Sequence, residues 1–186
     1  FPDVVSIYSS PHVVNANRTN NLDLSCKAIN NTILNPGDVF SFNGIVGERT
    51  AEKGYKSAIV YVSGNSESQL GGGVCQVSST IYMCTLLANL EQVERTEHMF
   101  AVTYVPMGMD ATVYWGSLDY KFKNNLENPI LVEANVADGY VNITLRGTKP
   151  QTDYDKIEMT YEILSTIPWS DVTKVDETKP ADYSEV

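Results

Sequence analysis

The alternation of apolar and polar residues predicts helices early in the chain. Residues 1–14 alternate loosely and predict a strand that leads to Pro11. A helix is then expected from about Thr19 or Asn20, which are both good N-cap residues, because the apolar residues that follow recur at helical spacing. The Asn30–Asn31 pair is expected to end this helix.

The middle of the chain predicts short strands, a loop and a buried helix. Val39–Phe42 and Tyr55–Val62 have the composition of short strands. Asn65–Gly73 is polar and rich in glycine, and predicts a loop. The segment from Val74 to Leu90 is apolar on nearly every side, which is typical of a helix buried in the core.

The later part of the chain predicts a series of antiparallel strands separated by turns. These strands are expected at Met99–Val105, Thr112–Trp115, Leu118–Lys123, Ile130–Asn135 and Tyr140–Leu145. Helices that precede a series of strands indicate an α+β fold, with the buried helix packed against an antiparallel sheet.

Composition and charge exclude some partners. Apolar residues make up 42% and charged residues 19% of the 186 residues, which is ordinary for a globular protein. The net charge is −10, and no cluster of lysine or arginine is present, so no nucleic-acid partner is expected. No apolar stretch approaches the length of about 18 residues that predicts a membrane span. The chain starts at Phe1 without a methionine, and we expect it to be a piece of a longer protein.

Three cysteines, Cys26, Cys75 and Cys84, argue against a disulfide framework, although one pair plus a free thiol stays open. Their spacing, and that of the histidines His12 and His98, does not suit a structural zinc site. No metal and no cofactor are therefore expected. Cys26 and Cys84 occupy core positions of the two predicted helices, and we expect both to be buried and reduced.

Cys75 is the main candidate for chemistry, because three glycines precede it and it opens the predicted buried helix. The N-terminus of a helix supplies free N–H groups and a positive dipole, which favour a thiolate and can hold an oxyanion. The alternative is that Cys75 packs as a small apolar residue.

A cysteine nucleophile needs a base, and the base needs an orienting group. His98 is the candidate base, and Asp110 is the candidate orienting group on an adjacent strand, with Asp119 as its substitute. His12, beside Pro11, is expected to be an ordinary loop residue. The order cysteine, histidine, aspartate, with the cysteine opening a buried helix, is that of papain-like and transglutaminase-like enzymes.

Polar residues near Cys75 are candidates for holding a substrate or an oxyanion. This candidate set consists of Gly73, Gln76, Ser78 and Ser79. Capping and local hydrogen bonds explain the polar side chains equally well. Three single arginines, Arg18, Arg49 and Arg95, could each neutralise a carboxylate of a ligand, but ordinary ion pairs are the favoured interpretation.

The sequence resembles the VanW family over roughly residues 15–147. The resemblance rests on GGGVCQVSSTIY, on ERTEH, on YVPMGMDATVYWGSLDYKFKN and on the upstream segment ILNPGDVFSFNGIVGERT. It implies a cell-envelope protein of Gram-positive type, connected with glycopeptide resistance and extracellular at the cell surface or wall. We expect a VanW-like domain at residues 1–148. Residues 149–186 resemble a linker or the truncated start of a small all-β cell-surface module.

Three hypotheses of function follow. The first is a thiol enzyme that hydrolyses or transfers the amide bonds of cell-wall peptides through Cys75, His98 and Asp110. The second is a non-catalytic domain that binds a cell-wall peptide or glycan, or acts as a scaffold. The third is a structural spacer. Contact with a membrane is expected only through an anchor outside this sequence.

Overall fold

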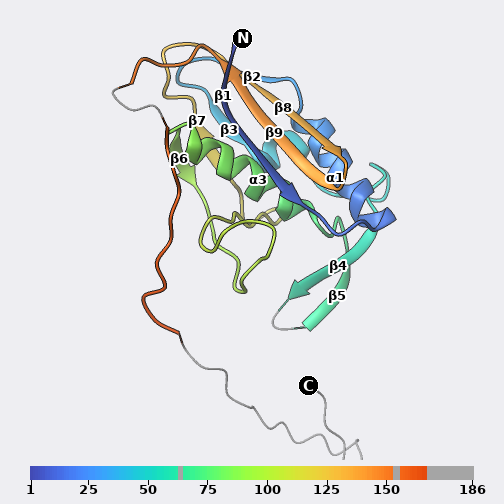
Figure 1. Cartoon of the computed structure of the whole chain (residues 1–186). Helices are drawn as coiled ribbons and strands as arrows, with labels where there is room; N and C mark the ends of the chain where they lie inside the picture. The colour runs from blue at the N-terminus through green and yellow to red at the C-terminus, as the bar shows by residue number, and fades with distance from the viewer. Residues whose placement is uncertain (63–64, 153–155, 167–186) are drawn as a thin grey trace, which may run out of the picture.

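The computed structural model describes residues 1–62, 65–152 and 156–166. The described chain folds into an α+β domain, as the sequence predicts, and Figure 1 shows its elements. In chain order they are β1 (Asp3–Pro11), α1 (Ala16–Ile29), β2 (Thr32–Leu34), β3 (Val39–Ser41), α2 (Phe42–Val46), β4 (Ser57–Val62), β5 (Asn65–Leu70), α3 (Val74–Leu87), β6 (Glu91–Glu94), β7 (Lys121–Lys123), β8 (Ile130–Ala137) and β9 (Tyr140–Gly147).

The main sheet is antiparallel, with the strand order β1-β9-β8-β2. A tight turn with positive φ at Asp138 and Gly139 joins β8 to β9. Alternate residues of β9 are fully buried, namely Val141, Ile143 and Leu145. Because side chains alternate between the faces of a strand, this pattern places one face of the sheet on the core. Helices α1 and α3 contact the sheet (Figure 1).

Helix α3 is the buried central helix. Val77, Ile81 and Cys84 have no exposed surface, and the helix contacts β1, β9 and α1. The first two turns are buried almost all round, which agrees with the absence of a polar face in the sequence. The helix begins at Val74, so Cys75 is its second residue and lies at the positive end of the helix dipole.

Two smaller sheets complete the fold. Strands β3, β7 and β6 form a three-stranded antiparallel sheet in the order β3-β7-β6. Strands β4 and β5 form a two-stranded hairpin, which Figure 1 shows extending from the body of the domain. The prediction of a loop over Asn65–Gly73 is therefore wrong for Asn65–Leu70. Strand β5 is not part of a buried sheet. Its sequence therefore shows no alternation of apolar and polar residues.

Helix α1 begins earlier than predicted. Its N-cap is Asn15, whose side-chain oxygen accepts hydrogen bonds from the backbone N–H groups of Asn17 and Arg18. The expected caps, Thr19 and Asn20, lie inside the helix. The predicted end is correct, because Asn30 is the C-cap.

Two predicted strands are wrong. Residues 99–105 and 112–115 run irregularly, with one isolated bridge from Tyr114 to Leu118. Their apolar residues serve as separate anchors: Val105, for example, packs in a small buried cluster with Met83 of α3 and with Met109, which lies between the two segments. Apolar residues that pack in this way can have the same spacing as those of a strand, although no ladder of backbone hydrogen bonds forms. Strands at β7, β8 and β9 are present as expected, although β7 is shorter than the predicted Leu118–Lys123.

The chain continues beyond β9 without regular secondary structure through residues 156–166. Much of the expected second module, residues 149–186, lies outside the described residues. Within the described ranges, none of the helices combines the length and apolar character needed to cross a lipid bilayer.

Candidate active site

The three glycines before Cys75 are explained by what surrounds them. A Cβ atom on Gly72 would lie 2.4 Å from the carbonyl oxygen of Ala58 in β4, which leaves no room for any other residue. Gly71 and Gly73 both have positive φ, and each packs against an arginine side chain. A Cβ atom on Gly71 would lie 2.8 Å from the Cβ of Arg49, and one on Gly73 would lie 3.0 Å from the Cγ of Arg18. The loop thus makes a tight turn into α3 and packs against the side chains of two arginines.

Cys75 is half-buried at the start of α3, and its thiol meets residues of two irregular segments. It donates a hydrogen bond of 3.4 Å to the carbonyl oxygen of Val113 and also interacts with the imidazole of His98. Burial by itself raises the pKa of the thiol. The hydrogen bond and charge of His98, assisted by Val113 and the charge of Arg49, outweigh burial and lower the pKa of Cys75 below its ordinary value.

His98 lies in the irregular segment after β6, and its ring is held between Asp110 and Cys75. The Nδ1 atom of His98 lies 2.5 Å from Oδ2 of Asp110, so the Nε2 edge of the ring is the edge left for the Cys75 thiol. Burial alone lowers the pKa of His98. The hydrogen bonds and charges of Asp110 and Cys75 prevail and raise the pKa of His98 to about 9.

Asp110 is nearly buried and carries the negative charge of the group. Burial alone raises the pKa of Asp110, but hydrogen bonds from His98 and the charge of Arg95 lower it below the usual value for a carboxyl group. Arg95 reaches Oδ1 of Asp110 at 3.3 Å and donates to its backbone oxygen at 2.7 Å. The expectation that Asp110 lies on a strand next to His98 is wrong, since both residues lie in irregular segments that side-chain hydrogen bonds hold together.

Two serines of α3 position the segment that carries Asp110. Ser79 Oγ accepts a hydrogen bond of 2.9 Å from the backbone N–H of Ala111, and Ser78 Oγ donates one of 2.7 Å to the Ala111 carbonyl oxygen. Both serines are fully buried. Their hydroxyl groups thus connect the helix of Cys75 to the residue after Asp110. Both hydroxyl groups are buried and bonded to Ala111, so they do not face an open substrate position.

Gln76 is also occupied within the protein. Its side-chain oxygen accepts from Arg18 at 2.9 Å, and its nitrogen donates to the Pro11 carbonyl oxygen at 2.8 Å and to Ser10 Oγ at 3.0 Å. Gln76 therefore connects the start of α3 to the end of β1. Gly73 is the N-cap of α3. The Cys75 N–H has no hydrogen-bond acceptor within the described residues, so this N–H is available as a donor to an oxyanion.

The other sequence candidates lie apart from the ring of His98. The carboxylate of Asp119 accepts from Ser41 Oγ at 2.6 Å and from the Asn43 backbone N–H at 2.8 Å, and so stabilises the β3–α2 junction. His12 interacts with the Val13 carbonyl oxygen in an exposed loop. Cys26 and Cys84 are fully buried and free. Burial raises the pKa of Cys26 to about 12 and raises that of Cys84 further.

Two further residues lie near Cys75: Tyr104, for which no role was predicted, and Arg49, which was expected to neutralise a carboxylate or to form an ordinary ion pair. The ring of Tyr104 meets that of His98 edge-on at 6.5 Å between centroids, and burial, followed by the charge of Cys75, raises the pKa of its hydroxyl. No local sequence pattern indicates that Arg49 approaches the loop formed by Gly71, Gly72 and Gly73, which we call the glycine loop.

A hollow of about 280 Å³ opens beside the pair formed by His98 and Asp110. Its lining includes apolar side chains from both irregular segments, namely Met99, Phe100, Val102 and Met107. Among the described residues, no three acidic, histidine or cysteine side chains gather in a way that could hold a metal ion.

The fold and this site define an α+β domain in which a cysteine at the N-terminus of a buried helix meets a histidine held by an aspartate. The chain belongs to the VanW-like family: residues 17–146 match the family described as VanW like protein.

Two curated relatives are similar to this chain. One is the uncharacterized protein YoaR of Bacillus subtilis (strain 168), which is 47% identical over 131 residues, covering 70% of this chain and 43% of that protein. The other is the vancomycin B-type resistance protein VanW of Enterococcus faecalis (strain ATCC 700802 / V583), which is 29% identical over 116 residues, covering 60% of this chain and 42% of that protein. The chain thus spans less than half the length of these relatives. No solved structure matches it.

Proposed function

We propose that this domain is a thiol enzyme that breaks or transfers amide bonds of cell-wall peptides. The observation that carries the proposal is the placement of His98 between Asp110 and Cys75. This arrangement supplies an activated nucleophile, a proton carrier and a group that orients the carrier. A likeness to papain-like or transglutaminase-like enzymes is part of the proposal and rests on this order of residues alone.

The reaction begins with the Cys75 thiolate and the protonated ring of His98. The sulfur attacks the carbonyl carbon of the amide, and the carbonyl oxygen takes up negative charge near the Cys75 N–H at the start of α3. His98 then gives its proton to the nitrogen of the leaving amine, and the C–N bond breaks to leave a thioester on Cys75. Water completes a hydrolysis, or a second amine completes a transfer. In either case His98 takes the proton from the attacking group, and the thiolate is released.

One relative supports the proposed substrate class. It is named as a vancomycin B-type resistance protein, and this chain belongs to the VanW-like family. We therefore propose that the protein works outside the cell, at the cell surface or wall, on a peptide or glycan-linked peptide. Any membrane anchor would belong to parts of the protein outside this sequence.

A binding function without catalysis is the second candidate, and exposed aromatic residues favour it. Tyr114 and Trp115 directly follow Val113, whose carbonyl oxygen binds the Cys75 thiol, and they are 62% and 46% exposed. Exposed aromatic rings next to a partly open site are typical of surfaces that bind peptides or sugars. In this alternative Cys75 is a packed residue of the binding site.

Incubation with soluble peptides released from Gram-positive cell walls, followed by mass spectrometry, tests the proposal. The enzyme should produce fragments or cross-linked products, and Cys75→Ala should abolish them while it still binds the peptides. Asp119→Asn is the matched control outside the group of Cys75, His98 and Asp110. Equal peptide binding by the wild type and Cys75→Ala, with no change in peptide mass in either case, would support the binding function and refute the proposed enzyme activity.

A further inference from the structure

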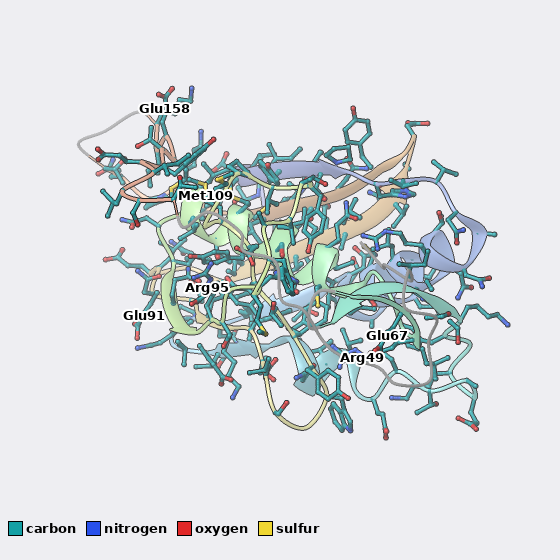
Figure 2. The ribbon with its side chains drawn as sticks, turned by 90° about the horizontal axis from the view of Figure 1, so that it is seen from below. Arg49, Glu67, Glu91, Arg95, Met109 and Glu158 are labelled. Carbon is teal, nitrogen blue, oxygen red and sulfur yellow. The ribbon has the colours of Figure 1, made fainter. Side chains whose placement is uncertain are left out.

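Arg49 lies beside the glycine loop, where its side chain packs against Gly71 while that of Arg18 packs against Gly73. Arg49 follows the short helix α2, and Gly71 lies four residues before Cys75. Its guanidinium group lies 5.7 Å above the ring of Phe42 and donates from Nη1 to Asn43 Oδ1 at 2.7 Å. Figure 2 shows Arg49 on the side of the molecule that carries the β4–β5 hairpin. These contacts hold the guanidinium group in one place and leave its other nitrogen for a different partner.

That other nitrogen, Nη2, is buried and makes no hydrogen bond within the described part of the chain. The ion pairs found among those residues include Arg95 with Asp110 and Arg146 with Glu133, but none includes Arg49. A buried charged donor without an acceptor is costly, and proteins keep few of them without a function. The acidic composition makes this more unusual, since 23 acidic side chains accompany only 13 basic ones.

The charges that act on Arg49 include that of Cys75. Burial lowers the pKa of Arg49, and the opposing influences come first from Cys75, then from Tyr55 and Asp119. Asp119 does not satisfy the guanidinium group, because its oxygens bind Ser41, the Asn43 N–H and the Tyr120 N–H. Arg49 thus lies close enough to Cys75 for their charges to interact, and its packing on Gly71 places it beside the loop that leads into α3.

We propose that Arg49 binds a carboxylate of the substrate, so that the enzyme prefers amide bonds that lie within a few bonds of a free carboxylate. The planar arrangement of donors in a guanidinium group fits the geometry of a carboxylate, and hydrogen bonds between two charged groups are stronger than those between neutral groups. The substrate class is therefore a peptide whose scissile amide is next to a C-terminal residue or to an acidic residue linked through its side chain. This inference rests on the proposed function, whose substrate it narrows.

Two alkylating agents of nearly equal size test the inference without a known substrate. Iodoacetate carries a carboxylate, whereas iodoacetamide carries a neutral amide, and both alkylate a thiolate with loss of iodide. The ratio of their rates at Cys75 measures recognition of the carboxylate, because any change in the amount of thiolate affects both rates alike. The rates are measured by mass spectrometry of the Cys75 peptide.

The ratio of iodoacetate to iodoacetamide rates should be higher at Cys75 than at the thiol of glutathione. Arg49→Gln should lower the ratio about tenfold, as expected for the loss of a hydrogen bond between charged groups. Arg49→Lys should keep part of the preference, since it retains the charge without the planar donor pair. Arg146→Gln removes an arginine far along the sequence in β9 and should leave the ratio unchanged. An equal ratio in the folded Arg49→Gln variant and the wild type overturns the inference.

A second measurement uses the wild-type protein alone, so it does not depend on the folding of a variant. N-acetyl-alanyl-alanine with a free carboxylate should protect Cys75 from iodoacetamide, and the same peptide with a C-terminal amide should protect it less. Equal protection by both peptides would refute recognition of the carboxylate. The proposed function fails in a different way: Cys75 would then react with iodoacetamide no faster than glutathione, whatever the ratio between the two reagents.

Discussion

The carboxylate oxygen Oδ2 of Asp110 accepts two hydrogen bonds from one residue, His98. One comes from the ring at Nδ1 over 2.5 Å, and the other comes from the backbone N–H over 2.7 Å. The ring and the backbone of His98 are therefore held by the same atom. Because a lone imidazole can rotate about its side-chain bonds, this double contact is what keeps the other edge of the ring towards Cys75.

Asp110→Asn should lower the pKa of His98 from about 9 towards its ordinary value near 6.5, because it removes the negative charge and the strongest acceptor. NMR titration of the imidazole in the wild type and the variant measures this shift. Any amide-bond activity should fall on the order of a thousandfold or more, as for other triads whose orienting carboxylate is lost. A His98 pKa that is unchanged in the variant would contradict the assigned pairing.

Cys75 should react with iodoacetamide faster than the other two thiols near neutral pH. The pKa of Cys75 is lowered, that of Cys26 is raised to about 12, and that of Cys84 is raised further, so Cys75 has the largest thiolate fraction of the three. Brief labelling at a series of pH values, followed by peptide mapping, measures each rate. Labelling that is as slow at Cys75 as at Cys26 would favour a packed cysteine.

The pH profile of that labelling has a predicted shape. An ordinary thiol gains reactivity around pH 8.5. The Cys75 thiolate forms at lower pH because it is paired with protonated His98, so its rate should already be high at pH 7. A second change is expected near pH 9, where the ring of His98 loses its proton. His98→Ala should move the first rise to higher pH, since burial then raises the Cys75 pKa without opposition from the ring.

Ser79→Ala should destabilise the domain by about 1–3 kcal/mol, because the Ala111 N–H loses its acceptor in a buried position. Urea denaturation measures the free energy of unfolding. The exposed Ser9, which donates to Asn142 at 2.7 Å, provides the control: Ser9→Ala should cost much less. The pKa of His98 should also fall in Ser79→Ala, since the segment that holds Asp110 loses one of its attachments to α3. Equal stability of the two variants would show that Ser79 does not secure this segment.

Gly72→Ala should destabilise the domain more than Gly116→Ala does. At Gly72 a methyl group would meet the Ala58 carbonyl oxygen at 2.4 Å, so β4 and the glycine loop would have to move apart. At Gly116 the space is open, and the cost is only that of a positive φ, about 1–2 kcal/mol. Thermal unfolding of both variants makes the comparison. The reverse order would mean that the loop before Cys75 yields easily.

Several features of this protein follow from the sequence alone because their causes are local. The buried helix at Cys75 follows from an apolar segment without a polar face, and the end of α1 at Asn30 follows from its capping residue. The turn at Asp138 and Gly139 predicts the β8–β9 hairpin in the same way. Each of these signals lies within about one turn of helix or one hairpin, so no distant part of the chain is needed to interpret it.

The course of the chain from His98 to Val113 was decided by tertiary contacts. Its apolar residues suggest strands, but the hydrogen bond that Arg95 donates to Asp110, the one that Ser79 accepts from Ala111, and the packing of Met109 on Met83 impose an irregular path. The position of Arg49 against Gly71 is of the same kind, because it joins residues 22 positions apart through packing alone. Contacts between residues that are distant in sequence produce no periodic pattern in the sequence. The residue types of the candidate site could therefore be recognised from the sequence, but their arrangement could not.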